Sequence, residues 1–117
     1  MIVGIGIDIV KIEKMEKAIA RWGDSFIDKI FNPQELESIM PGKVYLQRLA
    51  ARFAAKEAVI KAISQHYPLS LKDILIFSKE NGAPYCTIRK KVDVEVLISM
   101  THIEDYAVAT AIAQKKA

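Results

Sequence analysis

The sequence predicts an α+β fold, in which a mostly antiparallel sheet packs against a long central helix and shorter helices within a single domain, residues 1–117. Three observations support this prediction. The chain begins with one strand pattern and closes with two more, and its longest helical pattern lies between them. Its length and its 51% hydrophobic content suit one packed core.

The opening segment, residues 2–10, alternates as a strand does. Large apolar residues occupy one face, which we expect to be the core face, and the other face is nearly bare. Glycines inside a strand usually mark a close approach by another segment or by a ligand, and Asp8 stands on the glycine face. The apolar face consists of Val3, Ile5, Ile7 and Ile9, and the opposite face of Gly4, Gly6 and Asp8.

Residues 11–22 change to helical spacing, with an apolar stripe and a basic stripe, and Gly23 ends this helix. Residues 25–41 predict short helices, with Asn32 as a cap and Pro33 at the first helical position. The apolar stripe consists of Ile12, Met15, Ile19 and Trp22, and the basic stripe of Lys11, Lys14, Lys17 and Arg21.

The longest helical pattern spans residues 43–65. A 100° step per residue gathers one apolar stripe, and Glu57 falls in the middle of it. Residues 68–76 then predict a loop that leads into a strand, residues 81–84 a turn, and residues 85–88 a further strand. The stripe consists of Leu46, Leu49, Ala50, Phe53, Ile60 and Ser64.

Two alternating segments, residues 94–100 and 106–112, predict a hairpin joined around residues 101–105. The second segment is rich in alanine and is also compatible with a helix. The tip between these segments carries three polar side chains that could reach one anionic ligand, although loop histidines are more often incidental. These residues are Ser99, Thr101 and His102.

Asp8 and Glu57 are the strongest candidates for chemistry. A carboxylate on a bare strand face or inside an apolar stripe is costly unless a cation accompanies it. If the strand and the helix pack together, both carboxylates could bind one Mg²⁺ ion, which takes one or two protein carboxylates and completes its shell with water and substrate phosphates. Plainer interpretations stay open, because Glu57 could pair with Lys61 and Asp8 could cap the following helix.

The basic residues also have two interpretations. Arg48, Arg52 and Lys56 recur every four residues among alanines, which predicts either a ridge that holds phosphates or a solvated face. The basic stripe of residues 11–21 is either the solvated side of its helix or a surface that attracts an acidic protein. Cys86 shows no activating environment, so we expect a packed thiol.

Composition narrows the class of protein. The net charge of +3 is a mild basic excess, which matters only where positive residues cluster. One cysteine excludes an internal disulfide and favours a reducing compartment, so we expect a cytoplasmic protein. The apolar N-terminal run contains Asp8 and lacks the marks of a signal peptide, and no stretch is long enough to span a membrane.

Four motifs follow one another along the chain. They are Gly4-Ile5-Gly6-Ile7-Asp8-Ile9, Arg52-Phe53-Ala54-Ala55-Lys56-Glu57-Ala58-Val59-Ile60-Lys61-Ala62, Asn81-Gly82-Ala83-Pro84-Tyr85 and Ser99-Met100-Thr101-His102. In order and spacing they closely resemble the holo-acyl-carrier-protein synthase family of 4'-phosphopantetheinyl transferases. The longer, two-lobed class of these transferases has a third acid where this chain has Val10, so the resemblance is to the short trimeric class.

This resemblance implies transfer of 4'-phosphopantetheine from coenzyme A to a serine of an apo-acyl carrier protein, in support of fatty acid biosynthesis. It implies a homotrimer with sites between subunits, Mg²⁺ held by Asp8 and Glu57, and catalysis by these two residues with Lys61. The group that takes the serine proton stays open between Asp8, Glu57 and a bound water. The implied coenzyme A-binding residues are Arg52, Lys56, Lys61, Gly82, Ala83, Pro84, Ser99, Thr101 and His102. The implied carrier-protein-binding residues are Lys11, Lys14, Met15, Lys17 and Arg21.

Two other functions compete with this one. A basic RNA-binding module would explain the charge but not Glu57, and the chain lacks the clustered aromatics of a stacking platform. A magnesium phosphohydrolase would use the same carboxylates with water in place of serine. We therefore expect an enzyme whose partners are coenzyme A and a carrier protein, with no role for nucleic acid or membrane.

Overall fold

The computed structural model describes residues 1–117 and contains five strands, four α-helices and one 3-10 turn. The strands are β1 (Ile2–Lys11), β2 (Ile74–Ser78), β3 (Pro84–Ile88), β4 (Val94–His102) and β5 (Tyr106–Lys115). The helices are α1 (Ile12–Trp22), α2 (Asp24–Ile30), α3 (Pro33–Ser38) and α4 (Tyr45–Ile63), and the turn is η1 (Leu71–Asp73). The order and type of these elements confirm the predicted α+β class.

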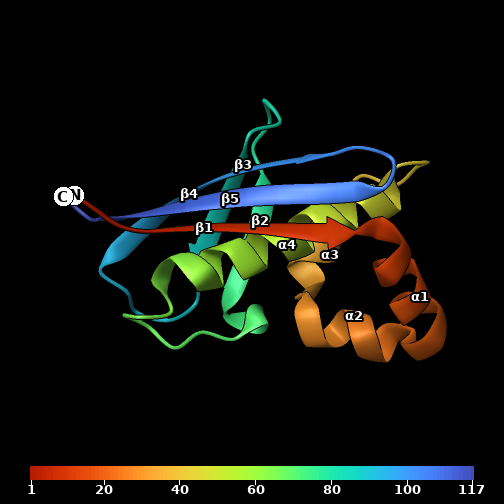
Figure 1. The fold of residues 1–117 in the computed structure, drawn as a ribbon, viewed down its shortest axis with the longest axis horizontal. Coiled ribbons are helices and arrows are strands. Elements are labelled where there is room, and N and C mark those ends of the chain that lie inside the picture. The colour runs from red at the N-terminus through yellow and green to blue at the C-terminus, as the bar shows by residue number, and fades with distance from the viewer.

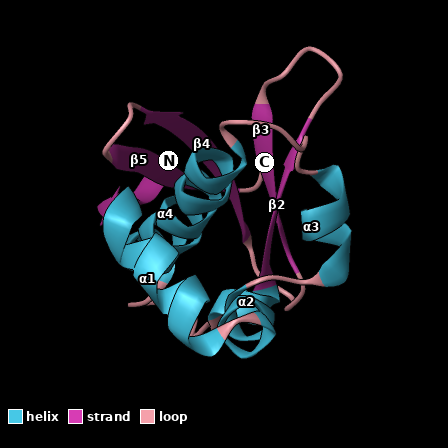
Figure 2. Cartoon of the chain, turned by 90° about the vertical axis from the view of Figure 1, so that its right-hand side faces the viewer, coloured by secondary structure: helices cyan, strands magenta, loops and turns pink.

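The strands form two antiparallel sheets rather than one. The first sheet has the order β1-β5-β4, and the second is the hairpin of β2 and β3 (Figure 1). The alanine-rich residues of β5 are therefore a strand, and they pair with β1 on one side and β4 on the other. The second sheet lies beside β4 of the first, and the tip of its hairpin projects away from the rest of the chain (Figure 2).

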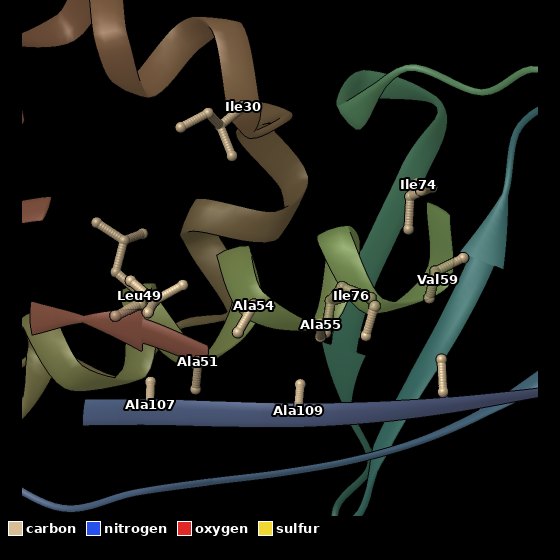
Figure 3. Packing of buried hydrophobic residues seen from close by; sticks show 14 of the residues in the cluster. Ile30, Leu49, Ala51, Ala54, Ala55, Val59, Ile74, Ile76, Ala107 and Ala109 are labelled. Atoms are coloured by element: carbon tan, nitrogen blue, oxygen red, sulfur yellow. The ribbon is translucent and has the colours of Figure 1, made fainter. Parts of the chain in front are cut away.

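Helix α4 forms the centre of the core and contacts strands of both sheets, because it runs beneath β1, β5 and β4 and also touches β2. Alanines of α4 face Ala107 and Ala109 of β5, so two backbones approach closely across small side chains (Figure 3). The single amphipathic stripe predicted for this helix is therefore wrong. Ser64, which the stripe included, is exposed, and the buried surface of α4 extends around most of its circumference.

The predicted core face of β1 is also wrong. Ile5, Ile7 and Ile9 are exposed by 72%, 60% and 62%, whereas the glycine face meets α4. A Cβ atom at Gly4 would lie 1.7 Å from the carbonyl oxygen of Ala62, so only glycine permits this approach. The expectation that the glycines mark a close approach is thus confirmed, and the approaching segment is the central helix.

Local signals in the short helices were accurate. Asn32 is the N-cap of α3, Pro33 follows it, and Glu35 completes a capping box with the Asn32 backbone and side chain. None of the helices is both long and apolar enough to cross a membrane.

Candidate active site

Asp8 and Glu57 line the same cleft, which has a volume of about 620 Å³ and opens between β1, α1 and α4. Asp8 comes from β1 and Glu57 from the middle of α4. The predicted convergence of the two carboxylates is therefore present in the structure. The other residues that line the cleft are Ile9, Val10, Lys11, Lys14, Met15, Ala18, Phe26, Phe53 and Tyr106.

The glycines of β1 explain why the two carboxylates meet. A Cβ atom at Gly6 would lie 2.0 Å from the carbonyl oxygen of Ala58, so the strand and the helix touch through their backbones. Asp8 lies two residues beyond Gly6 on the same strand face, and Glu57 immediately precedes Ala58. The close contact thus holds both acidic side chains at one edge of the strand–helix interface.

Lys61 joins this group from the next turn of α4. Its Nζ donates to Asp8 Oδ1 and to the Ile7 carbonyl oxygen, each at 2.9 Å. Glu57 forms no ion pair, so the plainer interpretation of Glu57 as the partner of Lys61 is wrong. Asp8 does not cap α1 either, because that helix begins after Lys11 without any side-chain cap.

The electrostatics of the cleft favour a cation. Burial raises the pKa of Glu57, the negative charge of Asp8 raises it further, and Lys61 opposes both effects. Two oxygen-donor side chains that repel each other suit Mg²⁺, which takes one or two protein carboxylates and leaves its remaining positions to water and phosphate. The residues present therefore fit a magnesium ion.

Helix α1 contributes a basic edge to the same cleft. Lys11 and Lys14 line it, whereas Lys17 pairs with Glu13 at 2.8 Å on the exposed side of the helix. The guanidinium of Arg21 lies 4.8 Å from the ring centroid of Trp22. Both Lys17 and Arg21 are therefore exposed but lie outside the cleft.

Two apolar residues of α1 differ from expectation. Met15 is only 3% exposed, so it forms the floor of the cleft and not a free contact on its rim. Trp22 is 57% exposed, although the predicted apolar stripe placed it in the core. The stripe ends one turn early because Gly23 turns the chain into α2 before anything covers Trp22.

Lys56 corrects the predicted basic ridge on α4. Its side chain is fully buried, and its Nζ donates to Glu35 Oε1 at 2.5 Å and to the carbonyl oxygens of Ile30 and Leu71. Its three donors are occupied on the side of α4 that faces α3 and η1, away from the cleft. Lys56 is therefore not available to a coenzyme A phosphate, contrary to expectation.

Arg52 occupies a different environment one turn earlier. It is 6% exposed, donates to the Arg48 carbonyl oxygen and to Ser78 Oγ, and its buried Nε has no partner. No carboxylate pairs with this guanidinium, and burial together with the charge of Arg48 lowers its pKa. Arg52 is buried, so the solvated face is wrong for this residue, and an anion beside its guanidinium would be stabilised.

The remaining predicted residues do not line the cleft of this single chain. Gly82, Ala83 and Pro84 lie at the tip of the β2–β3 hairpin, and Ser99, Thr101 and His102 lie at the end of β4. Strand alternation puts Ser99 and Thr101 on the exposed face, whereas His102 belongs to the opposite face. The idea that these three β4 side chains reach one ligand from one chain is therefore wrong.

Aromatic residues of the cleft were missed as site residues. Phe53, Phe26 and Tyr106 line the cleft beside the carboxylates. The pairing of β1 with β5 explains why Tyr106 is at the cleft. Tyr106 is the partner of Lys11, which lines the cleft from the end of β1. Phe53 lies one helical turn before Glu57, so its presence at the site follows from helical spacing once Glu57 is placed there.

Comparison with known proteins decides the family. The model of the 4'-phosphopantetheinyl transferase superfamily matches residues 4–111. The chain belongs to this superfamily. Among curated relatives of this transferase, the holo-[acyl-carrier-protein] synthase of Aquifex aeolicus is 38% identical over 120 residues, which cover 96% of this chain and 98% of the relative. That of Thermodesulfovibrio yellowstonii is 38% identical over 109 residues, covering 93% and 96%.

Solved transferase structures share the whole fold. The holo-[acyl-carrier-protein] synthase from Neisseria meningitidis superposes with a TM-score of 0.86 at 32% identity, over 98% of this chain and 100% of that one. The enzyme from Bacillus anthracis, solved in complex with coenzyme A (3',5'-ADP), has a TM-score of 0.84 at 30% identity over 99% of both chains. The phosphopantetheinyl transferase fold is therefore established for this chain.

Proposed function

We propose that this chain is a holo-acyl-carrier-protein synthase, which transfers 4'-phosphopantetheine from coenzyme A to a serine of an apo-acyl carrier protein and supports fatty acid biosynthesis. The cleft shared by Asp8 and Glu57, with Lys61 beside them, is the observation that carries this proposal. The names of the matched relatives, and the coenzyme A complexes among the matched structures, supply the substrate class.

Asp8 and Glu57 would hold Mg²⁺, which when bound would neutralise and polarise the pyrophosphate of coenzyme A. Lys61 then supplies positive charge to the transferring phosphoryl group from its position between Asp8 and the Ile7 carbonyl. Glu57 lines the cleft in which the serine would lie and is our candidate to accept its proton, directly or through one water.

The bond changes of the reaction balance without any further reagent. A bond forms between the serine oxygen and the phosphorus that carries pantetheine. The bond from this phosphorus to the bridging oxygen of the pyrophosphate breaks, and its electron pair leaves with adenosine 3',5'-bisphosphate. The serine proton passes to Glu57 or to water. The chain therefore acts through positioning and charge.

The carrier protein would approach along α1. Lys11 and Lys14 at the cleft, with the exposed Lys17 and Arg21 further along, present positive charge to an acidic partner. Met15 would support this surface from beneath, because it is buried under the cleft. The serine of the carrier would thereby arrive beside Glu57.

The uncovered face of the first sheet supports a homotrimer. Ile5, Ile7 and Ile9 of β1 continue across the register to Ile112 and Leu97, which makes one apolar surface on the side opposite α4. A surface of this kind on a folded chain favours association. In a trimer, Ser99 and Thr101, which share the exposed face of β4, would complete the site of a neighbouring subunit, with Arg52 and residues 82–84 binding coenzyme A.

The single thiol supports the proposal of a cytoplasmic protein. Cys86 is free, and burial raises its pKa to about 12. A lone unreactive thiol suits a reducing cytoplasm.

Intact-mass spectrometry of an apo-acyl carrier protein tests the function. The carrier would be incubated with this protein, coenzyme A and Mg²⁺, with and without chelator, and Glu57→Ala would run beside the exposed control Glu37→Ala. We expect a magnesium-dependent gain of one phosphopantetheine with the parent chain and with the control, and none with Glu57→Ala. No gain with several apo carriers would overturn the proposal, and release of adenosine 3',5'-bisphosphate without a carrier would identify a phosphohydrolase.

A further inference from the structure

A buried ion pair lies outside the active-site cleft, on the side of α4 that faces α3 and η1. Lys56 Nζ and Glu35 Oε1 are 2.5 Å apart, and neither side chain has any exposed surface. Buried charges are costly to desolvate, so a pair of this kind is weak evidence for stability alone. The proposed mechanism uses neither residue, which leaves the presence of the pair to be explained.

Every polar atom of this pair has a partner. Lys56 also donates to the carbonyl oxygens of Ile30 at 2.6 Å and Leu71 at 3.1 Å, and it lies 5.1 Å from the ring centroid of Phe31. Glu35 Oε1 also accepts from the backbone nitrogen and the side-chain amide of Asn32, each at 3.0 Å. Glu35 Oε2 accepts from the Ile76 backbone nitrogen at 3.0 Å.

These contacts connect α4 to four other segments: the end of α2, the start of α3, η1 and β2. Hydrogen bonds are directional, so this network defines both the rotation of α4 about its axis and its position along that axis. A fully satisfied buried network is the kind of interaction that can select one arrangement among several of similar packing energy.

The alanine surface of α4 that packs on the first sheet defines the rotation of the helix poorly, and the side-chain hydrogen bonds on that side are those of Lys61 with Asp8 and Ile7. The buried residues that face β1 and β5 are mostly alanines, and their counterparts on β5 are alanines too (Figure 3). Contacts between methyl groups are small and non-directional, so they set the distance between helix and sheet better than the rotation of the helix. Gly4 and Gly6 likewise meet carbonyl oxygens of α4 and limit only how closely it approaches.

We infer that Glu35 and Lys56 are positioning residues for the metal-binding carboxylate of Glu57. Glu57 follows Lys56 in sequence, so the two side chains project about 100° apart from the same turn of α4. Fixing Lys56 among its acceptors therefore fixes the direction in which Glu57 enters the cleft toward Asp8. This inference rests on the proposed function, because it assigns the pair a purpose within that site.

The double variant Lys56→Met with Glu35→Gln tests the inference. It removes both charges together, keeps similar side-chain volumes, and leaves an amide oxygen that can still accept from Asn32 or from the Ile76 backbone nitrogen. The control is Lys72→Met, because the Lys72 side chain also donates to two backbone carbonyl oxygens, those of Asp28 and Phe31, but forms no hydrogen bond or ion pair with α4.

Two measurements separate positioning from folding. Electron paramagnetic resonance of free Mn²⁺, titrated against the full chain with coenzyme A present, gives the metal affinity without any turnover. Transfer kinetics give kcat and the KM for the carrier protein, and thermal unfolding reports the fold. We expect the double variant to melt within about 5 °C of the parent, to bind Mn²⁺ roughly tenfold more weakly, and to lose at least about tenfold in kcat with an unchanged carrier KM.

Parent-like Mn²⁺ affinity and kcat in the folded double variant would overturn the inference. If that variant does not fold, Glu35→Gln alone replaces it. Its amide oxygen can still accept from Lys56 but no longer carries the charge that holds the ammonium, so a smaller loss of metal affinity is expected, and an unchanged affinity would overturn the inference. Failure of both variants to fold would also overturn it, because the pair would then be a requirement of the fold. Absence of Mn²⁺ binding by the parent chain would instead count against the proposed function.

Discussion

Gly6→Ala should damage both the fold and the active site, because β1 and α4 meet through their backbones at this residue. The new Cβ atom would lie 2.0 Å from the Ala58 carbonyl oxygen, 2.9 Å from the Ala62 nitrogen and 3.0 Å from the Ala58 carbonyl carbon. Ordinary contact begins near 3.4 Å, so the strand and the helix would have to separate by about 1.4 Å. No flexible side chain can yield instead, since all three atoms belong to the helix backbone.

The expected cost follows from this displacement. Overpacking a core usually costs roughly 1–3 kcal/mol, and a rigid backbone obstacle puts Gly6→Ala near the upper value, about 3 kcal/mol. For a domain of this size that loss lowers the midpoint of thermal unfolding by roughly 15 °C. A separation of this size also moves Asp8 away from Glu57, and about 1 Å of misplacement can reduce a rate roughly 100-fold.

Circular dichroism melts at one fixed protein concentration, together with transfer assays well below the melting midpoint, measure both effects. Gly42→Ala is the matched control, because a Cβ atom at Gly42 meets nothing within 4 Å and only the backbone angle φ of 134° opposes alanine. We expect the control to lose about 1 kcal/mol and to keep its activity. If Gly6→Ala melted no lower than Gly42→Ala, the backbone contact would not limit the approach of α4, and the explanation for the convergence of the carboxylates would fail.

Three further predictions follow from named groups. The raised pKa of Glu57 means that the native chain still holds a proton at pH values where the unfolded chain has released it, so the free energy of unfolding should fall as pH rises through the raised pKa. With chelator present, Glu57→Gln should therefore melt at a higher temperature than the parent at pH 8, and no higher near pH 4. Cys86 should resist iodoacetamide at pH 8 until urea unfolds the chain, since its pKa is about 12, and labelling of the native chain would contradict its burial. Ile5→Glu should convert an oligomer to monomers in analytical ultracentrifugation, because Ile5 is 72% exposed on the apolar face of the sheet, whereas a parent chain that is already monomeric would refute the trimer.

Periodicity in the sequence was enough to predict most elements. The strand at the N-terminus, the long helix and the C-terminal hairpin are all present within a few residues of their predicted bounds. Asp8 and Glu57 were predictable as a pair because each is a charged residue in a pattern of small or apolar neighbours, and such exceptions are informative.

Properties that depend on distant segments were not predictable from the pattern. Alternation on β1 separates isoleucines from glycines, but it does not say which face α4 covers, and the glycine face is the covered one. Lys56 resembles a surface lysine until Glu35, 21 residues earlier, is seen to meet it in the core. The separation of His102 from Ser99 and Thr101 was predictable, because alternation along one strand already assigns them to opposite faces.

The strand order β1-β5-β4 has a consequence for how the chain acquires its site. In this sheet β1 pairs only with β5, and Asp8 lies opposite Ala109, 101 positions later in the sequence. Closing so long a loop is entropically costly, and such non-local pairing slows folding. While the ribosome is still making the chain, α4 and its alanines emerge long before β5, so Asp8 gains its full backbone pairing only after β5 has been made. The cleft of Asp8 and Glu57 should therefore become ordered later than the helices that line it.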